Sequence, residues 1–237
     1  MPQVNKVLVF DIWGDYAHFR RIETTTSPLT YSIPTVTALS GIVSAVVGLE
    51  RDSYYEFFSK ENAKFAIRIL QPIKKVRINL SLIDTSRGFY LWDIKENPRT
   101  LIPFEFVKNP EYRIYVWLKN GKLYDELKEF LENHKTFYTP YLGISGLIAN
   151  FSFIGEFKNI VLKKTSKEEK IHSVIRRDRM EIVVEDGIYG LERIPMVMNK
   201  DRVVQEYVDI LYEMNARELK IKEGEFYKVG EENIVFL

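Results

Sequence analysis

Residues 6–49 read KVLVFDIWGDYAHFRRIETTTSPLTYSIPTVTALSGIVSAVVGL and contain the two elements on which the fold depends. The opening KVLVFDIW is rich in Val, Ile and Phe, which favours a β-strand over Lys6–Trp13. Further along, Thr35 precedes VTALSGIVSAVVGLE and is a suitable N-cap, because its hydroxyl can accept a bond from a free backbone N–H. The stretch therefore predicts a strand, a polar loop and a helix with one side of small residues.

Later segments extend this pattern. Strands are predicted at 64–70 (KFAIRIL), 112–118 (YRIYVWL) and 150–157, a helix is predicted at 123–133, and a short helix is predicted at 53–60. The main elements follow the βαββαβ order of a ferredoxin-like domain, in which both helices cover one face of a four-stranded antiparallel sheet. We therefore expect an α+β fold. The open face of such a sheet, or a groove beside it, commonly binds single-stranded RNA.

One long insertion and one appendage depart from this pattern. Within residues 71–110, apolar positions 78–82 and 89–91 flank Ser86-Arg87-Gly88, which predicts a hairpin. Residues 164–237 form a small β-rich appendage to a main domain at 1–163. In the appendage, Asp186-Gly187 between apolar runs predicts a hairpin, and 225–237 predicts another strand pair.

Composition limits the classes of function. The chain of 237 residues is 46% hydrophobic, so it can bury a sizeable core, and it has no cysteine for a disulfide or a thiolate metal site. It has neither a secretory pattern nor a run of about 18 apolar residues, so we expect a cytoplasmic protein without a membrane span. Residues 64–99 and 158–179 each contain eight Lys/Arg against three Asp/Glu, whereas 180–237 contains seven against thirteen. Basic stretches with aromatic residues between them suit a nucleic acid, although a solvated surface with ion pairs has the same composition.

Four stretches together resemble the CRISPR-associated Cas-five family of the RAMP superfamily, particularly its type I-B branch. They are residues 9–49, quoted above, 103–116 (PFEFVKNPEYRIYV), 137–157 (FYTPYLGISGLIANFSFIGEF) and 194–202 (IPMVMNKDR). They span most of the chain in the order that the family shows.

The resemblance implies an RRM-like domain with a thumb-like hairpin inserted at about 71–110. It also implies a place in the surveillance complex called Cascade, which serves antiviral defence. There the protein would bind the 5′ handle of the CRISPR guide RNA (crRNA), cap the filament of Cas-seven backbone subunits and help to seat the large Cas-eight-type subunit. Contact with target DNA would be indirect. The alternative is a metal-independent endoribonuclease that cuts the CRISPR repeat, as in the type I-C branch.

Several groups of residues are candidates for RNA contact. Arginines donate paired hydrogen bonds to phosphates, hydroxyls and N–H groups at a helix start can hold a phosphate, glycine permits close backbone approach, and aromatic rings stack on bases. On these grounds the candidates are His18, Arg20 and Arg21 in the loop, Thr35, Thr37 and Ser40 at the helix start, Gly143 and Ser145 in a short glycine-rich segment, and Lys74, Lys75, Arg77, Arg87, Phe89 and Tyr90 in the thumb. Ordinary capping, core packing and solvated loops are the alternative explanations.

The residues for catalysis are less distinctive. RNA cleavage without a metal needs a base, an acid and a cation at the phosphate. His134, Lys135 and Tyr141 offer these roles, as do His18, Arg20 and Tyr31, but neither set forms a signature. We expect a subunit that binds RNA without cutting it and has no metal site and no cofactor. A scaffold that binds only acidic protein surfaces is a third possibility, which salt-dependent RNA binding separates from the first two.

Overall fold

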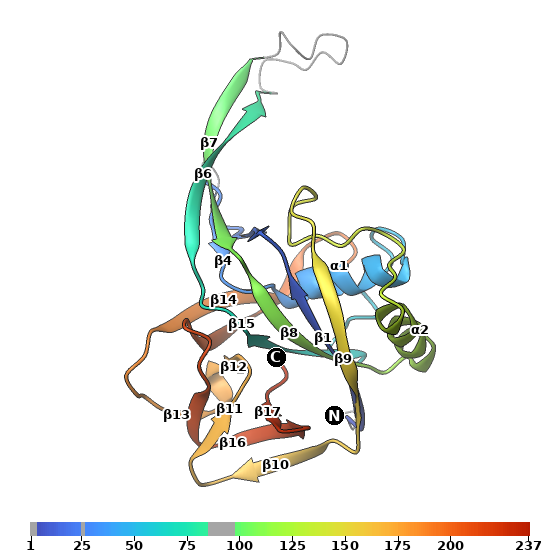
Figure 1. Cartoon of the computed structure of the whole chain (residues 1–237), viewed down its shortest axis with the longest axis vertical. Coiled ribbons are helices and arrows are strands. Elements are labelled where there is room, and N and C mark those ends of the chain that lie inside the picture. Colours follow the sequence, from blue (N-terminus) through green and yellow to red (C-terminus); the bar gives the residue numbers. More distant parts are fainter. Residues whose placement is uncertain (1–3, 25–26, 85–97) are drawn as a thin grey trace.

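The centre of the chain is a four-stranded antiparallel sheet with two helices on one face (Figure 1). A computed structural model describes residues 4–24, 27–84 and 98–237. The sheet has the order β5-β8-β1-β9, and every neighbouring pair is antiparallel. Its elements follow one another along the chain as β1 (Lys6–Trp13), α1 (Val36–Val47), β5 (Ala63–Ile69), β8 (Glu111–Leu118), α2 (Gly121–Glu132) and β9 (Asn150–Lys158). The predicted strands and the two main helices are confirmed, and their bounds shift by at most three residues.

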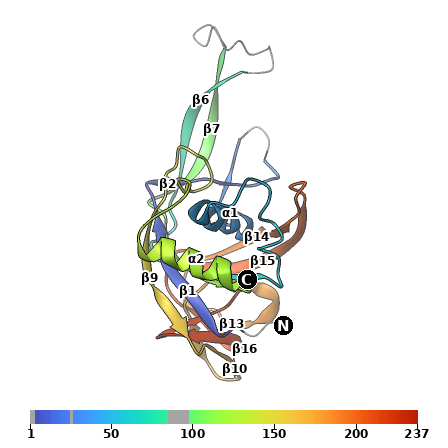
Figure 2. The same ribbon diagram turned by 90° about the vertical axis from the view of Figure 1, so that its right-hand side faces the viewer.

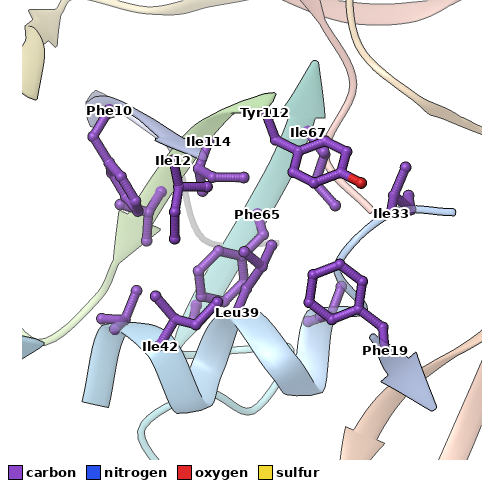
Figure 3. Packing of buried hydrophobic residues seen from close by; sticks show 14 of the residues in the cluster. Phe10, Ile12, Phe19, Ile33, Leu39, Ile42, Phe65, Ile67, Tyr112 and Ile114 are labelled. Atoms are coloured by element: carbon purple, nitrogen blue, oxygen red, sulfur yellow. The ribbon is translucent and has the colours of Figure 1, made fainter. Parts of the chain in front are cut away.

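Alternation along β1 divides its side chains between two cores. Leu8, Phe10 and Ile12 face the helices and belong to the main core. Figure 3 shows Phe10 and Ile12 of β1 on the side of the sheet that faces α1, where Leu39 and Ile42 project toward them. Each such side chain contributes about 1.5–3 kcal/mol when it is fully buried, so this layer anchors α1 on the sheet.

The opposite face of the sheet is covered rather than open. Val7 and Val9 of β1 pack there with Trp117 of β8 and with Ile234 and Phe236 near the end of the chain. The same face carries ion pairs, in which Arg113 holds Asp11 through two bonds of 2.8 and 3.0 Å and Glu232 at 3.0 Å. The expected open face of the sheet, on which a base could stack, is therefore covered in the described residues.

The C-terminal part consists of two further sheets, built on the long strands β14, β15 and β16. One has the order β10-β16-β11, with β13 and β17 also paired to β16, and the other has the order β12-β15-β14. The elements are β10 (Val161–Thr165), β11 (Glu169–Ile171), β12 (Ile175–Arg176), the 3-10 helix η3 (Arg177–Arg179), β13 (Glu181–Val183), β14 (Tyr189–Met198), β15 (Val204–Glu213), β16 (Leu219–Val229) and β17 (Glu232–Ile234).

The structure confirms one predicted pairing in this part and corrects another. β16 pairs with β17, as predicted for 225–237. The hairpin predicted at Asp186-Gly187 is wrong, because β13 pairs with β16 and β14 pairs with β15. Ile194, Met196, Val208 and Ile210 of β14 and β15 share the main core with the helices. The division into 1–163 and 164–237 stays a prediction, and side chains from both parts pack together in the main core.

A long hairpin, called the thumb below, projects from the body (Figures 1 and 2). It consists of β6 (Lys75–Ile83) and β7 (Arg99–Lys108), paired from Lys75 opposite Val107 to Ile83 opposite Arg99. The described part of the insertion is a hairpin, whereas the predicted turn at Ser86-Arg87-Gly88 and the apolar run at 89–91 lie outside the described residues. At its root β7 also pairs with β2 (Tyr16–Ala17).

Two smaller features complete the surroundings of the thumb root. The short strands β3 (Phe19–Arg20) and β4 (Thr30–Tyr31) pair with each other there. The helix predicted at 53–60 is wrong, because this segment forms a series of turns. These turns place Tyr54 and Tyr55 close to the start of α1.

Candidate nucleic-acid interface

Six residues proposed from the sequence meet at one cavity of about 410 Å³ between the thumb root and the start of α1. They come from three separate parts of the chain, and they are His18, Arg20, Thr35, Thr37, Ser40 and Gly143. The fold therefore gathers residues that the sequence could only propose one by one.

The start of α1 forms one wall of this cavity. Thr35 is its N-cap, as predicted, and its hydroxyl accepts a bond of 3.1 Å from the N–H of Ala38. The hydroxyls of Thr35 and Thr37 lie 2.9 Å apart, whereas Ser40 donates to the carbonyl of Val36 at 2.9 Å. Thr37 is thus the hydroxyl best placed to meet a ligand, and the positive end of the helix dipole lies beside it.

His18 is buried, with 2% of its surface exposed. Its Nδ1 lies 2.7 Å from the carbonyl oxygen of Glu105, and its ring packs against Phe104 and Phe106 at centroid distances of 5.2 and 5.6 Å. Burial lowers the pKa of this imidazole below its usual value, so the ring is neutral near pH 7. A neutral, buried ring cannot act as the phosphate-binding cation that the loop position suggested.

The neighbouring arginines have different surroundings. Arg20 is exposed, and its guanidinium donates one bond of 3.3 Å to the carbonyl of Thr24. Arg21 pairs with Glu192 of β14, and the side chain of Glu192 is only 5% exposed. The guanidinium of Arg20 is thus free to bind a phosphate, whereas that of Arg21 already has a buried carboxylate.

Glu192 belongs to a cluster of four charged groups at the thumb root. Besides Arg21, it accepts bonds of 3.0 Å from the backbone N–H and from the hydroxyl of Ser32. Lys75 of β6 lies 3.6 Å from Glu192 and 3.4 Å from Glu105 of β7. In this cluster, Arg21–Lys75–Glu105–Glu192, the ammonium of Lys75 is half-buried and already faces two carboxylates.

The other described thumb candidates face solvent. Lys74 and Arg77 are exposed and have no ion-pair partner within residues 4–24, 27–84 and 98–237. Arg87, Phe89 and Tyr90 lie outside the described residues, so their contact with RNA stays a prediction. Among the thumb residues proposed from the sequence, Lys74 and Arg77 are therefore the described ones that remain available for phosphates.

Gly143 has a structural reason to be glycine. Its φ of +97° is in a region that side chains disfavour, and a Cβ there would lie 1.9 Å from the carbonyl oxygen of His18. The N–H of His18 in turn donates to Leu142 at 2.9 Å. The glycine therefore lets the 142–144 loop sit against the His18 strand, and exposed Ser145 lies just outside the cavity.

The alternative catalytic residues are not joined in the structure. His134 follows Asn133, the C-cap of α2, with a φ of 51°, and its ring stacks on Phe151 at a centroid distance of 4.5 Å. No hydrogen bond or ring contact connects it with the side chains of Lys135 or Tyr141, all three of which the structure describes. Nothing in this arrangement resembles an assembled acid–base set.

Sequence reasoning missed the aromatic wall opposite α1. Tyr54 and Tyr55 line the cavity and stack at a centroid distance of 4.8 Å. Asp52 fixes their turn, because it accepts from the Tyr55 hydroxyl at 2.9 Å and from Arg202 at 3.0 and 2.8 Å. A local signal existed in the paired tyrosines, but Arg202 is 150 residues away in the sequence.

The described residues contain neither a candidate metal site nor a candidate membrane-spanning helix. No group of three or more His, Asp or Glu in that part of the chain is arranged to hold a metal ion. None of the helices described has both the length and the apolar character that crossing a bilayer requires.

Comparison with known proteins identifies the family. The family described as CRISPR-associated protein (Cas_Cas5) matches residues 7–222. The fold is similar to that of a CRISPR protein from Archaeoglobus fulgidus, with a TM-score of 0.56 and 13% identity over 97% of each chain. It is also similar to a chain of a "CRISPR RNA-guided surveillance complex", with a TM-score of 0.55 and 12% identity over 90% of this chain and 91% of that one.

No curated protein matches the sequence. The family match covers most of the chain, including the thumb and the cavity beside it. The chain therefore belongs to the CRISPR-associated Cas-five family.

Proposed function

We propose that this chain is the guide-RNA-holding, non-catalytic subunit of a type I Cascade complex in CRISPR defence, of the type I-B kind, and that it binds the 5′ handle. Family membership and a structural neighbour from an RNA-guided surveillance complex support this proposal. The observation that carries it is the cavity beside the thumb, where Arg20, Thr37 and the start of α1 converge.

The central unit serves this role as a ferredoxin-like, RRM-like domain. The observed order β5-β8-β1-β9, with both helices on one face, supports that assignment. Because the other sheet face is covered, RNA is held by the groove between the thumb root and α1 rather than on the sheet.

The thumb also has an apolar surface that suits contact with other subunits. Leu101 is 69% exposed, and Ile78 and Leu82 are more than one third exposed on the same hairpin. A two-stranded hairpin has little core of its own, so exposed apolar side chains on it suit burial against another subunit. We assign this surface to the Cas-seven backbone and the neighbouring large Cas-eight-type subunit of a cytoplasmic complex, with target DNA contacted only indirectly.

Salt-dependent binding tests the RNA assignment. The purified chain should bind handle-bearing RNA more tightly than a scrambled RNA of equal length, and log Kd should change linearly with log salt. Lys74→Ala and Arg77→Ala together should flatten this slope by about two units at most. Lys167→Ala is the matched control, since Lys167 is exposed in the loop between β10 and β11, which lies at the end of the molecule opposite the thumb (Figure 1). Equal affinity for both RNAs, or an equal effect of the control, would contradict the assignment.

A cleavage assay tests the non-catalytic part. The chain should leave its CRISPR repeat RNA intact with or without a divalent metal. Specific cleavage that His134→Ala abolishes would favour the endoribonuclease instead.

A further inference from the structure

The cavity beside the thumb has the lining of a nucleobase site rather than a phosphate site. Its volume of about 410 Å³ is in the usual range of small-ligand pockets. Aromatic and thioether side chains dominate the walls, among them Tyr54, Tyr55, Phe58, Phe104 and Met196. Arg20 is the only basic side chain except His18 among the described residues that line it. An apolar, aromatic interior stacks on a flat base, whereas a phosphate would remain at the Arg20 side.

His18 gives this interior one defined hydrogen-bonding group. The carbonyl oxygen of Glu105 can only accept, so Nδ1, 2.7 Å away, must carry the proton. In a neutral imidazole Nε2 is then a pure acceptor. Nε2 is buried, and it has no partner among the described residues.

A buried acceptor without a partner is unfavourable, and in native structures it indicates a group that a ligand or water completes. Because His18 lines the cavity and Nδ1 is held by β7, Nε2 is the ring nitrogen that remains for an occupant. An occupant that pairs with Nε2 would therefore have to present an N–H or O–H donor.

We propose that the cavity takes one unstacked nucleobase of the bound RNA and that His18 Nε2 accepts a hydrogen bond from the exocyclic amino group of that base. This inference rests on the proposed function, since it assumes that RNA passes beside the thumb root. Adenine, cytosine and guanine carry such an amino group. Uracil does not, and its single ring N–H lies between two carbonyl oxygens that would face the lone pair of Nε2.

Four flanking contacts support this assignment. Thr37 and the start of α1 are placed for the ribose–phosphate side of the same nucleotide. Arg20 is exposed at the cavity and able to pair with its phosphate. Phe104 belongs to the thumb and packs on His18, so the root of the thumb fixes the orientation of the acceptor.

The test compares two single-stranded 12-mers, oligoadenylate and the same length of purine riboside, whose base is adenine without the amino group. The full-length chain should bind oligoadenylate about tenfold more tightly, because the purine probe leaves Nε2 unpaired. His18→Phe keeps a ring beside Phe104 but removes the acceptor, so it should bind both probes equally and with an unchanged salt slope. Tyr55→Ala is the matched control, which should weaken both probes alike and keep the preference.

A second measurement uses the unaltered chain and does not depend on whether His18→Phe folds. The ¹⁵N resonance of Nε2 should move upfield with oligoadenylate and stay in place with the purine probe. Equal affinity of the unaltered chain for both probes, or an unmoved resonance at saturation, would overturn the inference. If salt-dependent binding to both probes remained in that case, the proposed function would stand. If neither probe bound, the inference would be overturned, and only equal affinity for handle-bearing and scrambled RNA would overturn the proposed function as well.

Discussion

Arg20 and Arg21 are adjacent in the sequence, and the structure predicts opposite consequences when each is replaced by alanine. Arg21 pairs with the buried carboxylate of Glu192, and its Nε donates to the carbonyl of Thr30 at 3.3 Å. Arg20 faces solvent beside the cavity. Arg21→Ala should therefore destabilise the fold, and Arg20→Ala should weaken RNA binding.

The magnitude for Arg21→Ala follows from what remains around Glu192. Removing one partner of a buried ion pair typically costs about 3–5 kcal/mol, because the other charge stays buried without compensation. Here the side chain of Arg21 is 31% exposed, and Lys75 remains 3.6 Å from the same carboxylate. Both facts reduce the loss, to about 2–3 kcal/mol. For a chain of this length that corresponds to a decrease in Tm of roughly 5–10 °C.

Chemical denaturation and RNA titration of the two variants form the assay. Arg20→Ala should change the free energy of unfolding by no more than about 0.5 kcal/mol, as exposed substitutions usually do. It should also reduce the salt slope of RNA binding by about one unit. A Glu192→Gln background supplies the internal control: with the buried charge removed, Arg21→Ala should cost clearly less.

Two results would refute this reasoning. One is an Arg21→Ala protein as stable as the unaltered chain. The other is an equal cost of Arg21→Ala with glutamate or glutamine at position 192, because the loss would then not come from an unpaired carboxylate.

Three other predictions concern the loop, the thumb and the histidines. Gly143→Ala should destabilise the chain by about 2 kcal/mol or more in denaturant titration, because its Cβ would overlap the carbonyl of His18 at a positive φ. Lys74→Ala alone should leave the unfolding free energy within about 0.5 kcal/mol and reduce the salt slope of RNA binding by about one unit. Stability should decrease as pH falls below about 6.5, the unfolded histidine pKa, because burial lowers the pKa of both His18 and His172. The unfolded chain then binds more protons than the folded chain, and unfolding curves between pH 5 and 8 measure the effect.

Each of these has a control in the same chain. Gly146→Ala should be neutral, because a Cβ there meets nothing within 4 Å. Lys167→Ala, in the loop between β10 and β11, should leave the salt slope unchanged. His172→Asn should make stability less dependent on pH, because His172 accepts a bond of 3.0 Å from the backbone N–H of Asn233 that protonation removes. A neutral Gly143→Ala, or stability that rises on acidification, would contradict the corresponding structural reason.

Local sequence predicted the elements that depend on local physics. The apolar run of β1, the Thr35 cap of α1 and the strand at 112–118 follow from side-chain shape and backbone hydrogen bonding within a few residues. The hairpin at Asp186-Gly187 failed because turn chemistry does not choose a strand's partner. The longer strands β15 and β16 offered better pairing to its two flanking segments.

For the candidate site, too, the sequence determined some features and the tertiary structure determined others. The sequence by itself determined which residue types stand near the thumb and α1, and it predicted the start of α1 correctly. Only the tertiary structure decided that Arg20 is free while Arg21 is not, because Glu192 lies 171 residues further along the chain. The same holds for His18, whose neutral state and whose Nε2, unpaired among the described residues, follow from its burial between the thumb root and the Gly143 loop. Charge and hydrogen-bonding roles depend on partners, and the partners here come together only when distant strands pack.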